Sequence, residues 1–403
     1  MFSIFKSFST ELKFYLLMNC FFSFGGALSG VFQSVFLWKL DKTYSLLAHY
    51  SLYWSISIIF CFGLCAWIAR KTSPMITMRL GFVCYLLTYL IMLIFHDTLG
   101  EHIILLGSLT GLAMSLYYVG VHMAVLDLTT NDKRDQFLYI QGILLTIGGV
   151  IGPLLAGILI SQFKGMTGYY IVFIATCVFF FISFLVSLKV KGNPVATKSY
   201  FWDVIRSPSQ EWKKMYKVMF ADGIVSGVYT TFLITMMTFK VAGGELSLGV
   251  FNTAAEIVSI IAFAVLAKFS NPDYRITIFA IGAVSIFLSS LLLSALPILI
   301  SLIIFAIIQP VSMNMITTSM NAMIYESIEK DPEYKKRRLD YIIIREVPLG
   351  VGRIIGVFLF LTMKKYFDIE QLLMISFSLF PIVYVIMIPF LKKVNVVPAT
   401  NRL

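Results

Sequence analysis

Twelve long apolar runs separated by short polar loops occupy most of this chain, and few folds can accommodate such a pattern. Each run holds about 20 residues or more, which as a helix rising 1.5 Å per residue crosses roughly 30 Å of hydrocarbon. Hydrophobic residues make up 59% of the 403 residues and charged residues 13%, which is too little polar surface for a soluble protein of this size. We therefore expect an all-α polytopic membrane protein with twelve transmembrane helices. The runs are 14–38, 46–69, 75–95, 102–127, 137–161, 167–189, 215–239, 248–268, 275–295, 297–325, 341–364 and 369–391.

Lysine and arginine are distributed unevenly between the two sets of loops. The set that contains both termini holds 24 of the 32, whereas the opposite set holds six. Excess positive charge marks the cytoplasmic side of a membrane protein. This asymmetry explains the formal net charge of +11 without nucleic-acid binding, and it predicts that both termini are cytoplasmic.

One charged segment followed by a glycine-rich apolar run occurs twice. The first copy is NDKRDQFLYIQGILLTIGGVIGPLLAG from Asn131, in which we expect NDKRDQ to be a loop, and the second is RRLDYIIIREVPLGVGRIIGVFLFL from Arg337. Superposing them pairs Arg134 with Arg338, Gln141 with Arg345, Gly148 with Gly352, and Gly152 with Gly356. Ser29-Gly30-Val31 of the first run likewise matches Ser226-Gly227-Val228 of the seventh. Such similarity at half-chain spacing predicts two parallel six-helix repeats.

The predicted domains are therefore an N-terminal six-helix bundle, 1–192, a cytoplasmic linker, 193–214, and a C-terminal six-helix bundle, 215–403. The linker contains Trp202 and Trp212 among basic residues. It could lie as an amphipathic segment on the anionic inner leaflet, or it could be an ordinary solvated connection.

Twelve runs, two similar halves and a basic central loop resemble the major facilitator superfamily of secondary transporters. The fifth run resembles the glycine-proline motif that family members use in antiport, where small residues allow close helix approach and proline permits a bend. Its matching residues are Gly148, Gly149, Gly152, Pro153 and Gly157. The resemblance implies that they form a hinge or packing face.

The loop between the second and third runs occupies the place of the family's gating motif. Arg70 and Lys71 keep its basic character, but its acidic residue has no match. An arginine-glycine motif of some proton-coupled exporters is also absent from the fourth run. We expect gate or loop-anchoring roles for residues at the cytoplasmic ends of spans, namely Arg70, Lys71, Asp127, Arg134, Glu326 and Arg338.

Ionisable residues inside the runs are the main candidates for the transport site, because charges within a membrane are costly and face a partner or a cavity. The second half contributes Asp222, Glu256, Arg345, Glu346 and Arg353. Glu256 and Arg353 both fall near mid-membrane by residue count, so we expect them to pair or to exchange partners with substrate. The alternatives are an ionic ladder along the eleventh run with Asp222 as partner, or purely structural ion pairing. Glu256 is the first candidate for carrying a proton and Asp222 the second.

The first half offers mostly aromatic and neutral polar side chains, with Gln33, His122 and Gln141 as candidate site residues. Such a surface suits an amphipathic or hydrophobic solute, although any single aromatic could simply pack the bundle. The sequence thus predicts an exporter driven by proton antiport in a bacterial plasma membrane, acting as a monomer without a cofactor. Uptake of a small polar or anionic nutrient, with an arginine as counter-charge, is one alternative. A lipid flippase-like, scramblase-like or non-transporting membrane protein is another. We find no constellation of residues typical of an enzyme.

Overall fold

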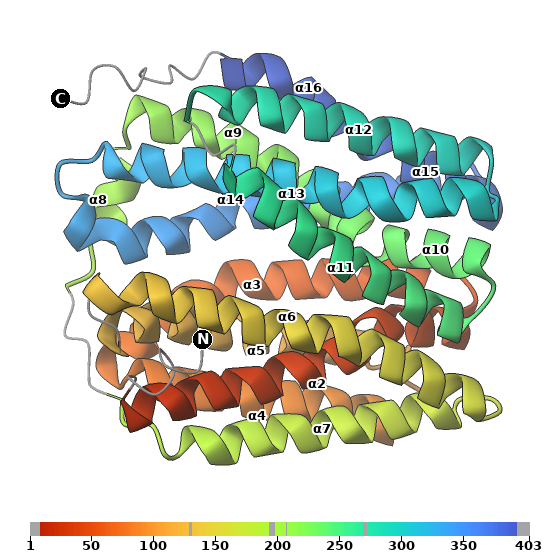
Figure 1. The fold of residues 1–403 in the computed structure, drawn as a ribbon, viewed down its shortest axis with the longest axis horizontal. Coiled ribbons are helices and arrows are strands. Elements are labelled where there is room, and N and C mark those ends of the chain that lie inside the picture. Colours follow the sequence, from red (N-terminus) through yellow and green to blue (C-terminus); the bar gives the residue numbers. More distant parts are fainter. Residues whose placement is uncertain (1–8, 129–130, 193–197, 207, 269–271, 393–403) are drawn as a thin grey trace. The chain divides into compact units, whose positions relative to one another are not determined.

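The computed structural model describes residues 9–128, 131–192, 198–206, 208–268 and 272–392. Side chains of 122–140, 143, 267–268, 272, 335, 338 and 392 lie outside the described part. The regular elements of the described residues are all helical (Figure 1). This agrees with the all-α expectation.

Helices α2 to α7 follow the first six apolar runs closely. They are α2 (Thr10–Asp41), α3 (Ser45–Lys71), α4 (Pro74–Ile94), α5 (Ile103–Leu128), α6 (Asn131–Gln162) and α7 (Thr167–Ser187). The prediction of a loop at NDKRDQ was wrong, because α6 already begins at Asn131. Its polar first turns extend the helix beyond the apolar run, and acidic residues near a helix start favour the helix dipole.

The second half begins with a short helix in the predicted linker and continues through six runs. Its elements are α8 (Phe201–Arg206), α9 (Gln210–Val225), the π-helix η1 (Ser226–Leu233), α10 (Ile234–Ala242), α11 (Glu245–Lys268), the 3₁₀ turn η2 (Pro272–Tyr274), α12 (Arg275–Ala295), α13 (Leu299–Glu329), α14 (Tyr334–Met363), α15 (Ile369–Leu379) and α16 (Ile382–Lys392). Helix α9, η1 and α10 together form the seventh span, and α15 with α16 forms the last.

Several helices begin at residues whose side chains satisfy a free backbone N–H group. Ser9, Ser73, Ser209 and Asp368 each accept a hydrogen bond from the N–H three residues later. Such caps replace the partners that the first turn of a helix lacks. At the other end of the seventh span, Gly243 adopts φ +80° and terminates α10, a conformation that costs glycine little.

Eleven spans among the described residues are long and apolar enough to cross a membrane. The twelfth is α14, which has 30 residues but carries Arg345, Glu346 and Arg353 within its apolar stretch. The protein is therefore a multi-pass membrane protein with twelve transmembrane helices in two six-helix bundles.

By its internal contacts the chain forms two compact units. The first comprises Met1–Lys198 with Gly244–Thr253, and the second comprises Ser199–Gly243 with Ala254–Leu403. The units group the first part of α11 with the N-terminal bundle and the predicted linker from Ser199 onward with the second unit. Lys39 of α2 forms an ion pair with Glu245, which also accepts a 2.9 Å hydrogen bond from the Tyr169 hydroxyl of α7. These bonds tie the start of α11 to the first unit.

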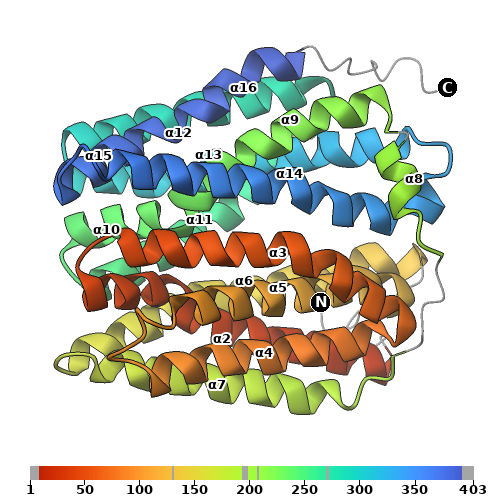
Figure 2. The same ribbon diagram turned by 180° about the vertical axis from the view of Figure 1, so that it is seen from behind.

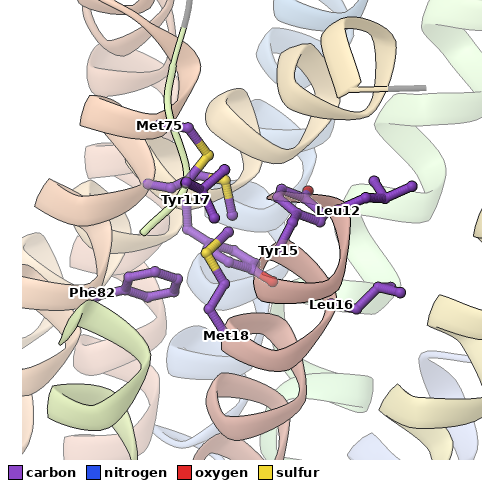
Figure 3. Close-up of a cluster of buried hydrophobic side chains, with 9 residues drawn as sticks. Leu12, Tyr15, Leu16, Met18, Met75, Phe82 and Tyr117 are labelled. Carbon is purple, nitrogen blue, oxygen red and sulfur yellow. The ribbon is translucent and has the colours of Figure 1, made fainter. Parts of the chain in front are cut away.

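The core of the first unit is built from interlocking aromatic and methionine side chains. Figure 3 shows Tyr15 and Met18 of α2 beside Met75 and Phe82 of α4 and Tyr117 of α5. The Tyr117 hydroxyl donates a 2.7 Å hydrogen bond to the Asn19 side-chain oxygen. This bond satisfies a buried amide that would otherwise be costly in an apolar bundle.

A glycine seam joins the fifth and first helices of the first unit. A Cβ atom at Gly152 of α6 would lie 2.8 Å from the Ala27 Cβ of α2, and one at Gly148 would lie 3.2 Å from the Phe24 backbone nitrogen. Only glycine permits this backbone separation, as in other small-residue contacts of membrane helices.

The second unit contains the same seam in its second copy. A Cβ atom at Gly356 of α14 would collide with the Ile224 carbonyl oxygen of α9, and one at Gly352 would lie 2.9 Å from the Gly223 Cα. Under the repeat alignment, Gly356 corresponds to Gly152 and Ile224 to Ala27. Equivalent residues therefore make equivalent contacts in both halves.

Candidate functional site

Two helices of the second unit carry charged residues within the membrane. Asp222 lies on α9, whereas Arg345, Glu346 and Arg353 lie on α14. The Glu346 carboxylate accepts a 3.2 Å hydrogen bond from Arg345 Nε and lies 3.6 Å from Arg353 Nη1. Glu346 and Arg353 are seven residues apart, so they project from the same face of α14 two turns apart. This is the ionic ladder that the sequence offered as an alternative.

Asp222 joins the ladder from the neighbouring helix. Its Oδ1 atom accepts a 2.8 Å hydrogen bond from the Tyr384 hydroxyl of α16. We call Asp222, Arg345, Glu346, Arg353 and Tyr384 the ion cluster. Its two carboxylates and two guanidinium groups sum to zero, so the cluster compensates its own charge.

The glycine seam of the second unit positions the ion cluster. A Cβ atom at Gly227 would lie 2.7 Å from the Arg353 Cα, so the backbones of η1 and α14 touch at the level of Arg353. Here the seventh span is π-helical, and the Thr231 hydroxyl donates a 2.6 Å hydrogen bond to the Ser226 carbonyl oxygen. Short π-helical segments are frequent at functional sites.

Glu256 stands apart from this cluster. The predicted Glu256–Arg353 pair is not formed in this structure, in which Arg353 lies 3.6 Å from the Glu346 carboxylate. Within the part of the chain that the structure describes, the exposed Glu256 carboxyl forms no ion pair or hydrogen bond. Eleven residues separate it from the start of α11, or about 16 Å along the helix axis. It is an acid near mid-span for which the described part of the chain supplies no counter-charge.

A polar stripe extends from Glu256 along α11. Asn252 lies one turn before it and Ser259 about one turn after it, so the three share a helical face. Asn314 of α13 donates hydrogen bonds to the Ser259 carbonyl oxygen and hydroxyl at 3.1 and 2.9 Å. This pairing holds α11 and α13 together next to Glu256.

The neutral polar candidates of the first unit are buried. Gln33 accepts a 3.3 Å hydrogen bond from the Tyr89 hydroxyl, which itself receives a 2.7 Å bond from Ser29. Gln141 is 8% exposed on α6. The side chain of His122 lies outside the described part. Gln33 thus has a structural partner, and its predicted site role stays a prediction.

The candidates at the basic ends of the helices have mixed environments. Glu326 of α13 pairs with Arg275 of α12 at 2.7 Å, an arrangement suited to loop anchoring. Lys71 lies 4.1 Å from the centre of the Trp67 ring, and Arg70 is half-buried. The side chains of Asp127, Arg134 and Arg338 lie outside the described part.

The glycine-proline segment packs on both of its sides. Besides the contacts of Gly148 and Gly152 with α2, a Cβ atom at Gly157 would lie 2.9 Å from the Glu245 carbonyl oxygen of α11. Pro153 lies inside α6 without interrupting it, and Gly149 is half-buried. These contacts agree with close packing, and the hinge role stays a prediction.

The sequence did not single out three residues that the structure places at charged contacts. Tyr384 lies in a largely apolar run, where one more hydroxyl gives no pattern. Lys39 and Glu245 lie at span ends, where charges usually face solvent. No group of His, Cys, Asp and Glu among the described residues could hold a metal ion.

The chain matches one family model and is similar to two bacterial proteins. Residues 98–335 match the family model of the Major Facilitator Superfamily. "Uncharacterized protein YqgE" of Bacillus subtilis is 24% identical over 386 residues, covering 95% of this chain and 90% of that protein. "Uncharacterized protein in sodM 3'region" of Geobacillus stearothermophilus is 28% identical over 165 residues, covering 41% of this chain and 77% of that protein.

Solved transporter structures share the fold at low sequence identity. A mutant of the nucleoside transporter NupG has a TM-score of 0.76 and 14% identity, covering 95% of this chain and 100% of that one. An auto-inhibited POT family peptide transporter has a TM-score of 0.73 and 10% identity, with 98% and 99% coverage. The human organic anion transporter MFSD10 has a TM-score of 0.66 and 12% identity, with 95% and 100% coverage.

Proposed function

The chain belongs to the Major Facilitator Superfamily, and we propose that this secondary transporter exports an amphipathic or hydrophobic solute in exchange for protons. The observation that carries the proposal is that Glu256 has no ion-pair or hydrogen-bond partner among the described residues. A carboxylate without a counter-charge is costly to keep ionised inside a membrane. A proton can neutralise it, and release of that proton on one side of the membrane can be linked to solute movement.

The carboxylates of the ion cluster differ from Glu256 in having partners, which supports Glu256 as the residue that carries the proton. Glu346 already has Arg345 and Arg353 as partners, and Asp222 accepts a hydrogen bond from the Tyr384 hydroxyl. The Glu346 charge is compensated without a proton, so protonation of Glu346 would leave Arg345 and Arg353 under-compensated. We assign the cluster to holding α9, α14 and α16 together and Glu256 to carrying the proton.

The chemistry of the first unit favours an amphipathic solute. Between their ends, α2, α3, α6 and α7 carry no Asp or Glu, whereas Tyr53, Trp54 and Tyr118 are half-buried or exposed. Aromatic surfaces with few charges suit apolar or weakly polar ligands. Arg345 and Arg353 are engaged with Glu346, which disfavours uptake of an anion that would need a free arginine.

The proposal is tested with purified protein in proteoliposomes and a panel of fluorescent amphiphiles that includes ethidium, whose permanent charge prevents pH partitioning. We expect dye to accumulate in vesicles with an acidic lumen and to leave when nigericin collapses the proton gradient. Dye movement that does not depend on the proton gradient would contradict proton antiport. Failure to move any amphiphile would contradict the proposed class of solute.

A further inference from the structure

The short helix α8 is fixed to the second unit at the level where α14 enters its apolar run. The Asp340 carboxylate accepts a 3.3 Å hydrogen bond from the Ser199 hydroxyl and a 3.1 Å bond from the Tyr200 N–H group. Asp340 is 1% exposed and directly precedes the run 341–364. The Arg337 guanidinium lies 6.0 Å from the centre of the Tyr200 ring. Four groups therefore determine where α8 begins.

A second charged network supports this attachment from the loop before α14. Asp331 accepts hydrogen bonds from the Tyr341 hydroxyl at 2.8 Å and from Arg337 at 3.2 Å. Burial raises the pKa of the Asp331 carboxyl, but these bonds and the backbone N–H of Glu333 outweigh burial and hold it below its usual value. Asp331 is thus ionised at neutral pH and keeps Arg337 against Tyr200.

The attachment orients one face of α8 outward. Val204 is fully buried, whereas Trp202 is 64% exposed and Ile205 40% exposed. Trp202, Ile205 and Arg206 are three and four residues apart, so they share a face. Figures 1 and 2 show α8 lying across the ends of α9 and α14. An exposed tryptophan at this level is typical of the membrane–water interface.

Uncompensated positive charge accompanies this face. Arg206 of α8, and Lys213 and Lys217 of α9, are exposed and form no ion pair or hydrogen bond within the described residues. Asp203, the acidic neighbour on α8, lies three residues before Arg206, but the two form no ion pair in the described part of the chain. Trp212 is fully buried and stacks edge-on against Tyr341 at 4.8 Å. Of the two linker tryptophans, only Trp202 is therefore free to contact lipid.

We propose that Trp202, Ile205 and Arg206, together with Lys213, form a binding surface for the headgroup of an anionic phospholipid. Trp202 and Ile205 enter the interface between headgroups and acyl chains, and the basic side chains contact the phosphate and the negative surface around it. This surface binds lipid independently of the solute that the protein transports.

The test follows Trp202 fluorescence in proteoliposomes, isolated as the difference between the native chain and its Trp202→Phe variant. Phosphatidylglycerol and phosphatidylcholine brominated on their acyl chains serve as quenchers at equal mole fractions. We expect brominated phosphatidylglycerol to quench Trp202 more strongly. The preference should disappear in an Arg206→Gln, Lys213→Gln double variant and weaken at high salt, because salt screens exposed charges.

Lys164→Gln provides the matched control, since this exposed lysine lies in the loop between α6 and α7 at the opposite ends of the helices. It should leave the preference unchanged. Equal quenching by both lipids would overturn the proposal by showing contact without headgroup selection. Absence of quenching by either would overturn it by placing Trp202 in water.

Discussion

Glu346 compensates the positive charges of Arg345 and Arg353 on α14. It is 8% exposed and contacts Arg345 on one side and Arg353 on the other. Removing one partner of a buried ion pair leaves the other charge uncompensated, and that residual charge accounts for most of the cost. We therefore expect removal of Glu346 to destabilise the second unit, because it leaves a buried arginine charge uncompensated.

Glu346→Gln should lower the free energy of unfolding by about 3 kcal/mol, the magnitude typical of a broken buried pair. Adding Arg353→Gln should recover part of that loss, with a coupling energy of roughly 1–3 kcal/mol. Reversible unfolding in mixed detergent micelles measures both values.

Glu370→Gln is the matched control, because Glu370 pairs with Lys240 but its side chain is 70% exposed. Exposed pairs contribute at most about 1 kcal/mol. Similar losses from Glu346→Gln and Glu370→Gln would show that the ion cluster does not stabilise the second unit.

At the scale of the helix, the two glycine seams connect the fifth span to the first and the eleventh to the seventh. The first copy pairs Gly152 with Ala27, and the second pairs Gly356 with Ile224. The copies differ at other positions, because Gln141 and Gly149 of the first correspond to Arg345 and Arg353 of the second. Both seams pack closely, but only the second carries charge.

Gly152→Ala and Gly142→Ala should have opposite effects although both lie in α6. A Cβ atom at Gly152 would meet Ala27 at 2.8 Å, whereas one at Gly142 has nothing within 4 Å. Overpacking costs about 1–3 kcal/mol, and alanine in an open helical position gains up to about 1 kcal/mol over glycine. Thermal unfolding in detergent should show a lower midpoint for Gly152→Ala and an equal or higher midpoint for Gly142→Ala. Equal midpoints for the two variants would contradict the close contact between Gly152 of α6 and Ala27 of α2.

For the whole molecule, the sequence predicted the number of spans, the repeat and the charged residues of α14. Apolar runs and charge positions are properties of the chain itself, so they can be found without a structure. The partner of Asp222 could not be found in this way, because the Tyr384 hydroxyl reaches it only after α9 and α16 pack. The same limit applies to the predicted pair of Glu256 with Arg353, because equal depth along two helices does not determine which side chains meet when the helices pack.

The linker illustrates a further limit. Trp202 and Trp212 have similar sequence surroundings, yet one is exposed and the other is fully buried. Asp340 and Tyr341 of α14 cause this difference by binding Tyr200 and packing on Trp212. Contacts between residues this far apart in the chain leave no local pattern.

The proposed proton-coupled export depends on Glu256 carrying the proton that drives solute movement. Glu256→Gln keeps the shape of the side chain but removes its ionisable group. Gradient-driven dye accumulation and gradient-independent counterflow of the same dye should therefore respond differently, since only the first needs proton release. Glu101→Gln, at an exposed glutamate between α4 and α5, serves as the control and should preserve both activities.

The decisive measurement compares these two activities in proteoliposomes of the Glu256→Gln variant. The account predicts that accumulation under a proton gradient is lost while counterflow is retained. Accumulation equal to that of the native chain, or loss of counterflow together with accumulation, would contradict the assignment of proton coupling to Glu256.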